Sequence, residues 1–279
     1  MLRKTIKTHA ALEGIGLHRG KPSRVVFLPA AGPTGLRFSG PGSETPVPAL
    51  LTSVAGTARG TNIRCGETVL YTVEHLLSAA AGLGLDDLDM EISGEEPPAM
   101  DGSALPFAEA LLKAGITDKA GQESPAAAAF GAFEFSAGES RYRAEPRPGP
   151  LSVKLIYDYP HKLVGRQELE FTLSAETYRK EVAPARTFGF SHELEALKAA
   201  GLARGGSLDN AVVITETEIL ARNGLRFPDE FVRHKLLDLL GDLALSGLPL
   251  SGMRIEAERS GHAANVNFAK LLLEKAQKQ

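Results

Sequence analysis

The stretch from residue 227 to residue 245, FPDEFVRHKLLDLLGDLAL, constrains the fold more than any other part of the chain. Its leucines and its Pro228-Asp229-Glu230 start predict a helix, with acidic side chains in the first turn, where the helix dipole favours negative charge. A helix that carries so many leucines belongs in a core. Any fold for this chain must therefore bury this helix.

Three polar residues on the same helix conflict with simple burial. His234, Asp238 and Asp242 recur every fourth residue, so they form one stripe along the helix. Burying two carboxylates and an imidazole is unfavourable unless something compensates them, and a metal ion can do so. His234 and Asp238 could ligate one cation, which leaves Asp242 for another partner. The alternative is a solvated polar stripe on an amphipathic helix.

Composition excludes several classes of protein. The chain has 279 residues, 43% of them hydrophobic, which is enough for one large domain or two ordinary ones. A net charge of -3 without a concentrated basic run argues against nucleic acid as a partner. The single Cys65 fits a reducing compartment, and neither a signal peptide nor a membrane-spanning run is recognisable. We expect a soluble cytoplasmic monomer.

Short strands and helices alternate along the rest of the chain. In the first half we predict strands and turns up to residue 70, a helix over 72–83 with Thr72 as N-cap, a strand over 88–92 and a helix over 107–114. The polar and alanine-rich segment 119–129 predicts a boundary between domains 1–122 and 128–279. In the second half we predict strands over 133–135, 142–144, 152–157, 167–173 and 253–258, and helices over 192–200 and 265–275.

The two halves share one layout. Each has strands, a helix with a histidine (His75 or His234), a strand, a polar residue (Asp101 or His262) and a helix. The spacing between histidine and polar residue is 26 residues in the first half and 28 in the second. This near-equality predicts two copies of one unit. If the copies pack as pseudo-symmetric partners, His75 and His234 meet.

A metal held by His75, His234 and Asp238 would have three protein ligands and a fourth position for water, as in catalytic zinc sites. Iron(II) would use the same set. Glu74, beside His75, could take the proton of a water bound there. The alternative for Glu74 is a helix acid in the first turn.

Amide hydrolysis also needs an acid for the departing amine and a donor for the oxyanion. His262, in a glycine-flanked turn, is the available acid, and a nearby Asp242 would raise its pKa and keep it charged. Thr187 offers a hydroxyl, and Lys235 could meet a phosphate. Each has a simpler interpretation, because Thr and Lys are usually solvated or capping residues and His262 could cap a helix.

The motifs TVEHLLSAAAGLGLDDL, PPAMDGSALPF, ARTFGF, GLARGGSLDNAVV, RFPDEFVRHKLLDLLGDLAL and SGHAANV resemble, in order and spacing, the UDP-3-O-acyl-N-acetylglucosamine deacetylases of lipid A synthesis. GIGLHRGK fits as well, and the resemblance extends from about residue 3 to residue 275. It implies an α+β fold with two pseudo-symmetric domains, in which helices are sandwiched between sheets and the active site lies between the domains.

The resemblance also implies roles for individual residues. The zinc ligands would be His75, His234 and Asp238. The groups that act on the acetamide would be Glu74 as base, His262 as the cation that protonates the amine, Asp242 as its support, and Thr187 as a partner of zinc in polarising the carbonyl. Lys235 would bind the substrate diphosphate, and Phe188 would contact the sugar.

The family has an inserted strand-helix-strand unit that forms an apolar passage for the acyl chain. That unit corresponds to about residues 190–215, and its candidate lining residues are Leu194, Leu197, Leu202, Ala203, Ala211 and Val212. Arg259 stands where relatives often have Lys, and Asp158 and Tyr159 match the uridine side only loosely. Asp101 is either an acceptor for a ligand ring N–H or a turn-forming residue before Gly102.

The expected reaction is hydrolysis of the N-acetyl group of the acylated UDP-amino sugar, which releases acetate in the committed step of lipid A synthesis. Two alternatives stay open from the sequence. One is a zinc amidase that acts on a different acetylated sugar. The other is a sugar-nucleotide-binding relative that has lost the chemistry.

Overall fold

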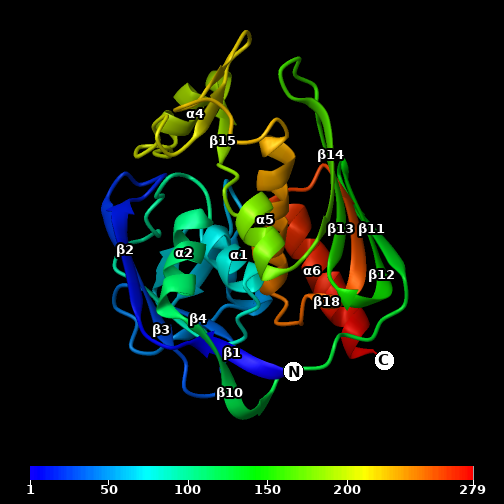
Figure 1. The fold of residues 1–279 in the computed structure, drawn as a ribbon. Coiled ribbons are helices and arrows are strands. Elements are labelled where there is room, and N and C mark those ends of the chain that lie inside the picture. Colours follow the sequence, from blue (N-terminus) through cyan, green and yellow to red (C-terminus); the bar gives the residue numbers. More distant parts are fainter. Residues whose placement is uncertain (279) are drawn as a thin grey trace.

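A computed structural model describes residues 1–278 and confirms the α+β class. Two five-stranded sheets lie on opposite sides of the molecule, and four helices lie between them (Figure 1). These helices are α1 (Glu74–Gly82), α2 (Leu105–Ala114), α5 (Glu230–Ala244) and α6 (His262–Gln277). This is the expected sheet/helix/helix/sheet sandwich.

The sheet of the first half has the strand order β2-β3-β9-β4-β5. Its strands are β2 (Ala10–Ile15), β3 (Pro22–Pro29), β9 (Leu88–Ile92), β4 (Leu36–Ser39) and β5 (Val47–Pro48). A separate ribbon pairs β1 (Leu2–Ile6) with β10 (Ile116–Glu123). A small sheet contains β6 (Val54–Gly56), β7 (Asn62–Cys65) and β8 (Thr68–Leu70).

The sheet of the second half has the strand order β11-β12-β18-β13-β14. Its strands are β11 (Phe133–Ala137), β12 (Ser140–Pro150), β18 (Ser251–Glu258), β13 (Ser152–Tyr159) and β14 (Gly165–Thr172). A short helix, α3 (Ala175–Thr177), continues into a π-helical turn over Tyr178–Val182. An outlying unit follows, with β15 (Phe188–Phe190), α4 (Leu194–Ala199), β16 (Val212–Ile214) and β17 (Ile219–Leu220), and Figure 1 shows it at the top of the molecule.

Both large sheets use the same sequence of strand pairings. In the first sheet β2–β3 and β3–β9 are antiparallel, β9–β4 is parallel and β4–β5 is antiparallel. The second sheet repeats this pattern through β11–β12, β12–β18, β18–β13 and β13–β14. In each half the parallel pair brackets one central helix, α1 or α5. The repeat inferred from residue spacing is therefore present in the topology.

The two central helices pack directly against each other, and a glycine allows their close approach. A Cβ built on Gly241 of α5 would lie 2.2 Å from the carbonyl oxygen of Glu74 at the start of α1. No side chain larger than hydrogen fits there without moving a helix. Gly241 therefore sets the distance between the two elements that carry Glu74, His75, His234 and Asp238.

Four local predictions need correction. Residues 119–123 are the end of β10 and not a linker, because pairing with β1 outweighs their weak strand propensity. Thr72 is not the N-cap: its φ is 58°, which is unlike the extended N-cap conformation, and Val73 precedes the helix without a side-chain cap. The last helix starts at His262, three residues earlier than predicted, and α4 is shorter than 192–200.

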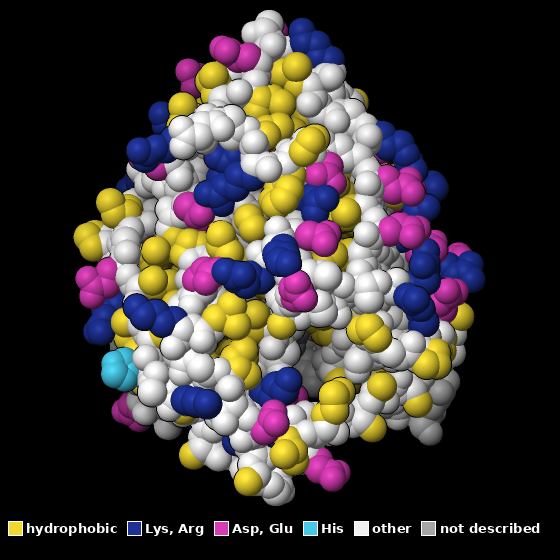
Figure 2. Space-filling model, in the orientation of Figure 1, with side chains coloured by type: hydrophobic (Ala, Val, Ile, Leu, Met, Phe, Trp, Pro, Cys, Tyr) yellow, Lys and Arg dark blue, Asp and Glu magenta, His cyan; other side chains and the backbone are white. Residues whose placement is uncertain are grey.

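An open cleft of about 1130 Å³ lies where the N-terminal strand, the connection between the halves and the loop after α5 come together. Figure 2 shows this hollow near the lower edge of the face in view. Its lining is mainly apolar and includes Leu2, Leu36, Leu50 and Leu250. None of the helices in residues 1–278 is long and apolar enough to cross a membrane.

Candidate active site

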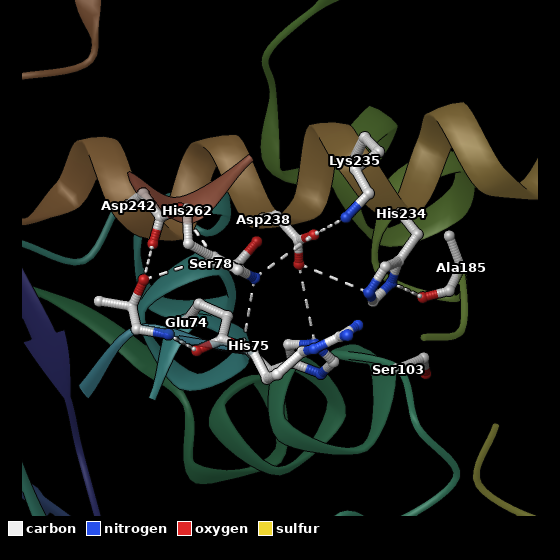
Figure 3. Close-up of polar contacts among 12 residues, drawn as sticks. Glu74, His75, Ser78, Ser103, Ala185, His234, Lys235, Asp238, Asp242 and His262 are labelled. Carbon is white, nitrogen blue, oxygen red and sulfur yellow. Dashed lines mark hydrogen bonds and ion pairs between the residues drawn. The ribbon is translucent and has the colours of Figure 1, made fainter. Parts of the chain in front are cut away.

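Helices α1 and α5 bring the three predicted metal ligands together. Oδ1 of Asp238 lies 3.4 Å from Nε2 of His234 and 4.0 Å from Nε2 of His75, and the two imidazole rings are 5.1 Å apart between centroids. All three side chains are buried. Figure 3 shows them converging from α5 above and α1 below.

The donor atoms of this trio fit a cation. Within residues 1–278, Oδ1 of Asp238 is buried and has no hydrogen-bond partner, which is rare for a carboxylate oxygen. Nδ1 of His234 donates to the carbonyl oxygen of Ala185 at 3.1 Å, so its Nε2 carries a lone pair. That nitrogen faces the unpaired oxygen. Two imidazole nitrogens and a carboxylate are ligands that zinc and iron(II) accept.

The protonation states of His75, His234 and Asp238 are also those that a metal site requires. Burial lowers the pKa of His75 to about 3 and also lowers the pKa of His234, so both rings are neutral near pH 7. Burial alone would raise the pKa of Asp238, but Lys235 and the surrounding imidazoles bring it well below its usual value. Asp238 is therefore ionised, as metal binding requires.

A second set of groups lies beside the trio. Nε2 of His262 is 3.9 Å from Oε1 of Glu74 and 3.9 Å from Oδ2 of Asp238. Burial raises the pKa of Glu74 to about 7, a value suited to accepting and releasing a proton near neutral pH. His262, predicted in a glycine-flanked turn, is the first residue of α6 and follows Gly261, the N-cap residue.

Asp242 holds His262 in the charged form. Nδ1 of His262 donates to Oδ2 of Asp242 at 3.0 Å. Burial works against the imidazolium, but the charges of Asp242, Asp238 and Glu74 outweigh it and raise the pKa of His262 to about 10. Of two titratable neighbours, Glu74 can therefore serve as a base while His262 remains an acid.

Thr187 and Phe188 reach the site from the start of β15. The backbone N–H of Thr187 donates to Gly102 O at 2.8 Å, and Thr187 and His75 line one small pocket. The Phe188 ring is 5.9 Å from the His234 ring. Nζ of Lys235 lies 5.3 Å from the Phe188 ring and bonds Oδ2 of Asp238 at 3.0 Å. The structure thus places the ammonium group of Lys235 beside Asp238, one of the predicted metal ligands.

The outlying unit has the predicted strand-helix-strand order, with β15 and β16 parallel. Leu194, Leu197, Leu202, Ala203 and Ala211 are half-buried. Val212 is fully buried and belongs to the main core, so its side chain serves packing. The unit is also tied to the first half, because the N–H groups of Ala203 and Arg204 donate to Nδ1 and the carbonyl of His18.

Of the residues considered for the nucleotide, Asp158 and Tyr159 lie at the end of β13, and Arg259 directly follows the neighbouring strand β18. Arg259 bonds Asp158 at 3.1 Å and Glu139 at 3.0 Å. The Tyr159 ring stacks on Phe190 at 4.3 Å between centroids. Tyr159 thus packs against β15, while Arg259 is held by the carboxylates of Asp158 and Glu139.

Asp101 forms a turn and also an ion pair between the halves. Its Oδ1 accepts hydrogen bonds from the N–H and the hydroxyl of Ser103, and its Oδ2 accepts one from Arg226 at 2.7 Å. Both oxygens are thus engaged with Ser103 and Arg226 and not with an imidazole. Arg226 also donates to Pro184 O, so the ion pair fastens the loop before α2 to the segment before Thr187.

Two residues of this site gave no functional signal in the sequence. Thr61 and Asn265 both hydrogen-bond to Asp242. Asn265 lies three residues after His262, one turn along the same helix, and that spacing is the pattern that could have drawn attention to it. Thr61 precedes a short strand, and nothing in its surroundings marks it.

Comparison with known proteins gives the family. Residues 3–274 match the family model described as UDP-3-O-acyl N-acetylglycosamine deacetylase. The chain belongs to this family. Curated proteins named UDP-3-O-acyl-N-acetylglucosamine deacetylase match along nearly the whole chain.

The relative from Nitratidesulfovibrio vulgaris is 43% identical over 281 residues, which cover 99% of this chain and 89% of the relative. The relative from Anaeromyxobacter sp. (strain Fw109-5) is 40% identical over 277 residues, covering 97% and 88%. The relative from Anaeromyxobacter dehalogenans is 38% identical over 275 residues, covering 97% and 87%. The family resemblance noted from the motifs is thus confirmed.

Proposed function

We propose that this member of the deacetylase family hydrolyses the N-acetyl group of UDP-3-O-acyl-N-acetylglucosamine, releasing acetate and a free amine. Its place is the committed step of lipid A synthesis. One observation carries the proposal: a buried His-His-Asp cluster with an unpaired carboxylate oxygen lies beside a Glu-His pair whose pKa values are separated. Together the two sets supply a site for a polarising cation, a base for water and an acid for the departing amine, which suffices to hydrolyse an amide near neutral pH.

The metal would be held by His75, His234 and Asp238, with zinc as the first candidate and iron(II) as the alternative. When bound, such a cation polarises a carbonyl oxygen and increases the acidity of water. His234 is fixed for this purpose by its bond to Ala185 O, which points Nε2 at Asp238.

Glu74 would accept the proton of the attacking water. Its carboxylate is buried, and its Oε2 accepts the backbone N–H of Thr61 at 2.9 Å, so Oε1 remains on the side of His262 and Asp238. A pKa of about 7 leaves Glu74 largely ionised at slightly alkaline pH and strong enough as a base to remove a proton.

His262 would donate a proton from Nε2 to the departing amine. Its Nδ1–H is committed to Asp242, so Nε2 is the nitrogen that faces the reacting groups. A departing amine needs protonation because the free amide anion is a very poor leaving group. Thr187 would donate its hydroxyl to the acetyl oxygen as negative charge develops there.

Substrate binding would involve the surfaces that flank these groups. We assign Phe188 to the sugar, Lys235 and Arg259 to the diphosphate and nucleotide end, and the half-buried Leu194, Ala203 and Ala211 to the acyl chain. Lys235 would have to share its ammonium group between Asp238 and a phosphate. Domains 1–122 and 128–279, a cytoplasmic location and a monomeric state stay predictions.

Removal and restoration of metal tests the proposal. Dialysis of the purified protein against a chelator should abolish acetate release from the acylated UDP-sugar, and zinc or iron(II) should restore it. His75→Ala is the matched control, since it should fold and yet gain no activity when metal is added. Full activity of the metal-free protein would reject this mechanism, and equal rates on unrelated acetylated sugars would favour a broader amidase.

A further inference from the structure

Asp242, the carboxylate behind His262, is fully enclosed by hydrogen-bond donors. Its exposed fraction is 0%. Besides Nδ1 of His262, Oδ2 accepts Nδ2 of Asn265 at 2.9 Å, and Oδ1 accepts the hydroxyl of Thr61. Three donors, one from Thr61 before β7 and two from the first turn of α6, thus fix both oxygens of one carboxylate.

The orientation of Asn265 is itself determined. The hydroxyl of Tyr142, on β12, donates to Oδ1 of Asn265 at 2.6 Å. A hydroxyl that donates to the amide oxygen leaves the amide nitrogen to point at Asp242, which fixes the amide assignment. Tyr142 cannot drift, because its ring is buried and stacks on Phe268 at 4.7 Å. Tyr142 thus orients Asn265, and Asn265 in turn bonds Asp242.

Thr61 has a second connection. Its backbone N–H donates to Oε2 of Glu74 at 2.9 Å while its hydroxyl bonds Asp242. Thr61 belongs to the first half and is fully buried, whereas Asp242, Asn265 and Tyr142 belong to the second half. Thr61 therefore holds Glu74 through its backbone and Asp242, the partner of His262, through its side chain.

We propose that Thr61, Asn265 and Tyr142 are positioning residues that fix Asp242 and so aim Nε2 of His262 at the departing amine. This inference rests on the proposed function, in which His262 is the acid. Asp242 has two rotatable side-chain bonds, and Nδ1 of His262, at the first position of α6, bonds Asp242. Loss of one donor leaves a buried carboxylate lone pair unpaired, and the side chain turns to recover it.

A purely structural role would be the competing explanation, since these bonds also join the halves. The two roles differ in what they affect. A structural bond changes stability and disturbs substrate binding and catalysis alike. A positioning bond changes kcat, leaves KM nearly unchanged, and matters only while His262 is present.

Thr61 permits a matched pair of variants. Thr61→Val keeps the shape and removes the hydroxyl, and Thr61→Ser keeps the hydroxyl and removes the methyl group. Because the bond goes to a charged acceptor, we expect Thr61→Val to lower kcat of the metal-loaded enzyme by about 10- to 100-fold with little change in KM. Thr61→Ser should restore most of that loss. Tyr142→Phe, which removes only an oxygen, should lower kcat by less, because it acts through Asn265.

A double-mutant cycle with His262→Ala decides between the two roles. If Thr61 acts through His262, Thr61→Val should lower the residual kcat of His262→Ala by less than about twofold. An equal loss in both backgrounds, or unchanged kcat in Thr61→Val and Tyr142→Phe, would overturn the inference. Should Thr61→Val not fold, the same cycle is run with Tyr142→Phe. Full activity of His262→Ala alone would instead refute the proposed acid.

Discussion

Replacement of Gly241 by alanine tests whether the spacing of α1 and α5 makes the site. The new Cβ would lie 2.2 Å from Glu74 O and 2.9 Å from the Glu74 carbonyl carbon, and both atoms are backbone. No side-chain rotation can relieve this contact. The helices must separate, and they carry His75 on one side and His234 with Asp238 on the other.

The size of the effect follows from that contact. Reaching an ordinary van der Waals separation of 3.4 Å requires a shift of roughly 1 Å between the helices. Overpacking in a well-packed core costs about 1–3 kcal/mol of stability. A misplacement of about 1 Å between reacting groups can lower the rate by about 100-fold. We therefore expect a folded variant with a large loss of activity and weakened metal binding.

Gly82 offers a control at the equivalent position of α1. It lies seven residues after His75, as Gly241 lies seven after His234. A Cβ on Gly82 would lie 2.4 Å from the buried Tyr178 ring, so Gly82→Ala also overpacks, away from the site. Thermal unfolding, metal affinity from competition with a chromophoric chelator, and kcat/KM should be measured for both variants. The reasoning fails if Gly241→Ala keeps normal metal affinity and kcat/KM, or if Gly82→Ala loses them equally.

Two further predictions concern the protons and the charge around the site. The pH profile of kcat/KM should be bell-shaped, because Glu74 must lose a proton and His262 must keep one. The acidic limb should have a midpoint at or below about pH 7 and the alkaline limb at or below about pH 10, because a bound cation lowers the pKa of both Glu74 and His262. A Glu74→Ala variant with an unchanged acidic limb would contradict this assignment. Lys235→Ala should weaken UDP binding by about 10- to 100-fold while the metal stays bound, since a charged hydrogen bond to phosphate is lost. Unchanged UDP affinity in a titration would exclude Lys235 from the diphosphate site.

Residue spacing was sufficient to predict the metal cluster, because its geometry depends on one helix and one repeat. The four-residue interval puts His234 and Asp238 on one face of α5, and the similar layout of the halves brings His75 to them. Many strands of the large sheets were predictable from alternation, but the order of the strands within each sheet was not predicted from the sequence. Strand ends and helix starts were less accurate, as at Thr72 and residues 119–123, because they depend on tertiary pairing.

The support around the cluster could not be predicted from the sequence. Thr61, before β7, and Asn265, on α6, bond Asp242, and Tyr142, on β12, bonds Asn265. These contacts bridge up to 181 positions in the chain. A buried threonine, asparagine or tyrosine is common in any core. Only the folded structure shows which of them bond to Asp242. The pairing of Asp101 with Arg226 is hidden for the same reason.

The repeat also explains why the site is asymmetric. Counting from each histidine, Asp238 and Asp242 of α5 correspond to Ala79 and Leu83 of α1, while Glu74 corresponds to Arg233. Each helix thus contributes its histidine, but the first supplies the base and the second supplies the carboxylates. Neither half contains all three of the proposed metal ligands, so the His75–His234–Asp238 cluster exists only when the halves pack together. That packing depends on Gly241, which lies against the backbone of Glu74. The contact that joins the halves therefore also sets the distance between the proposed base and the proposed metal ligands.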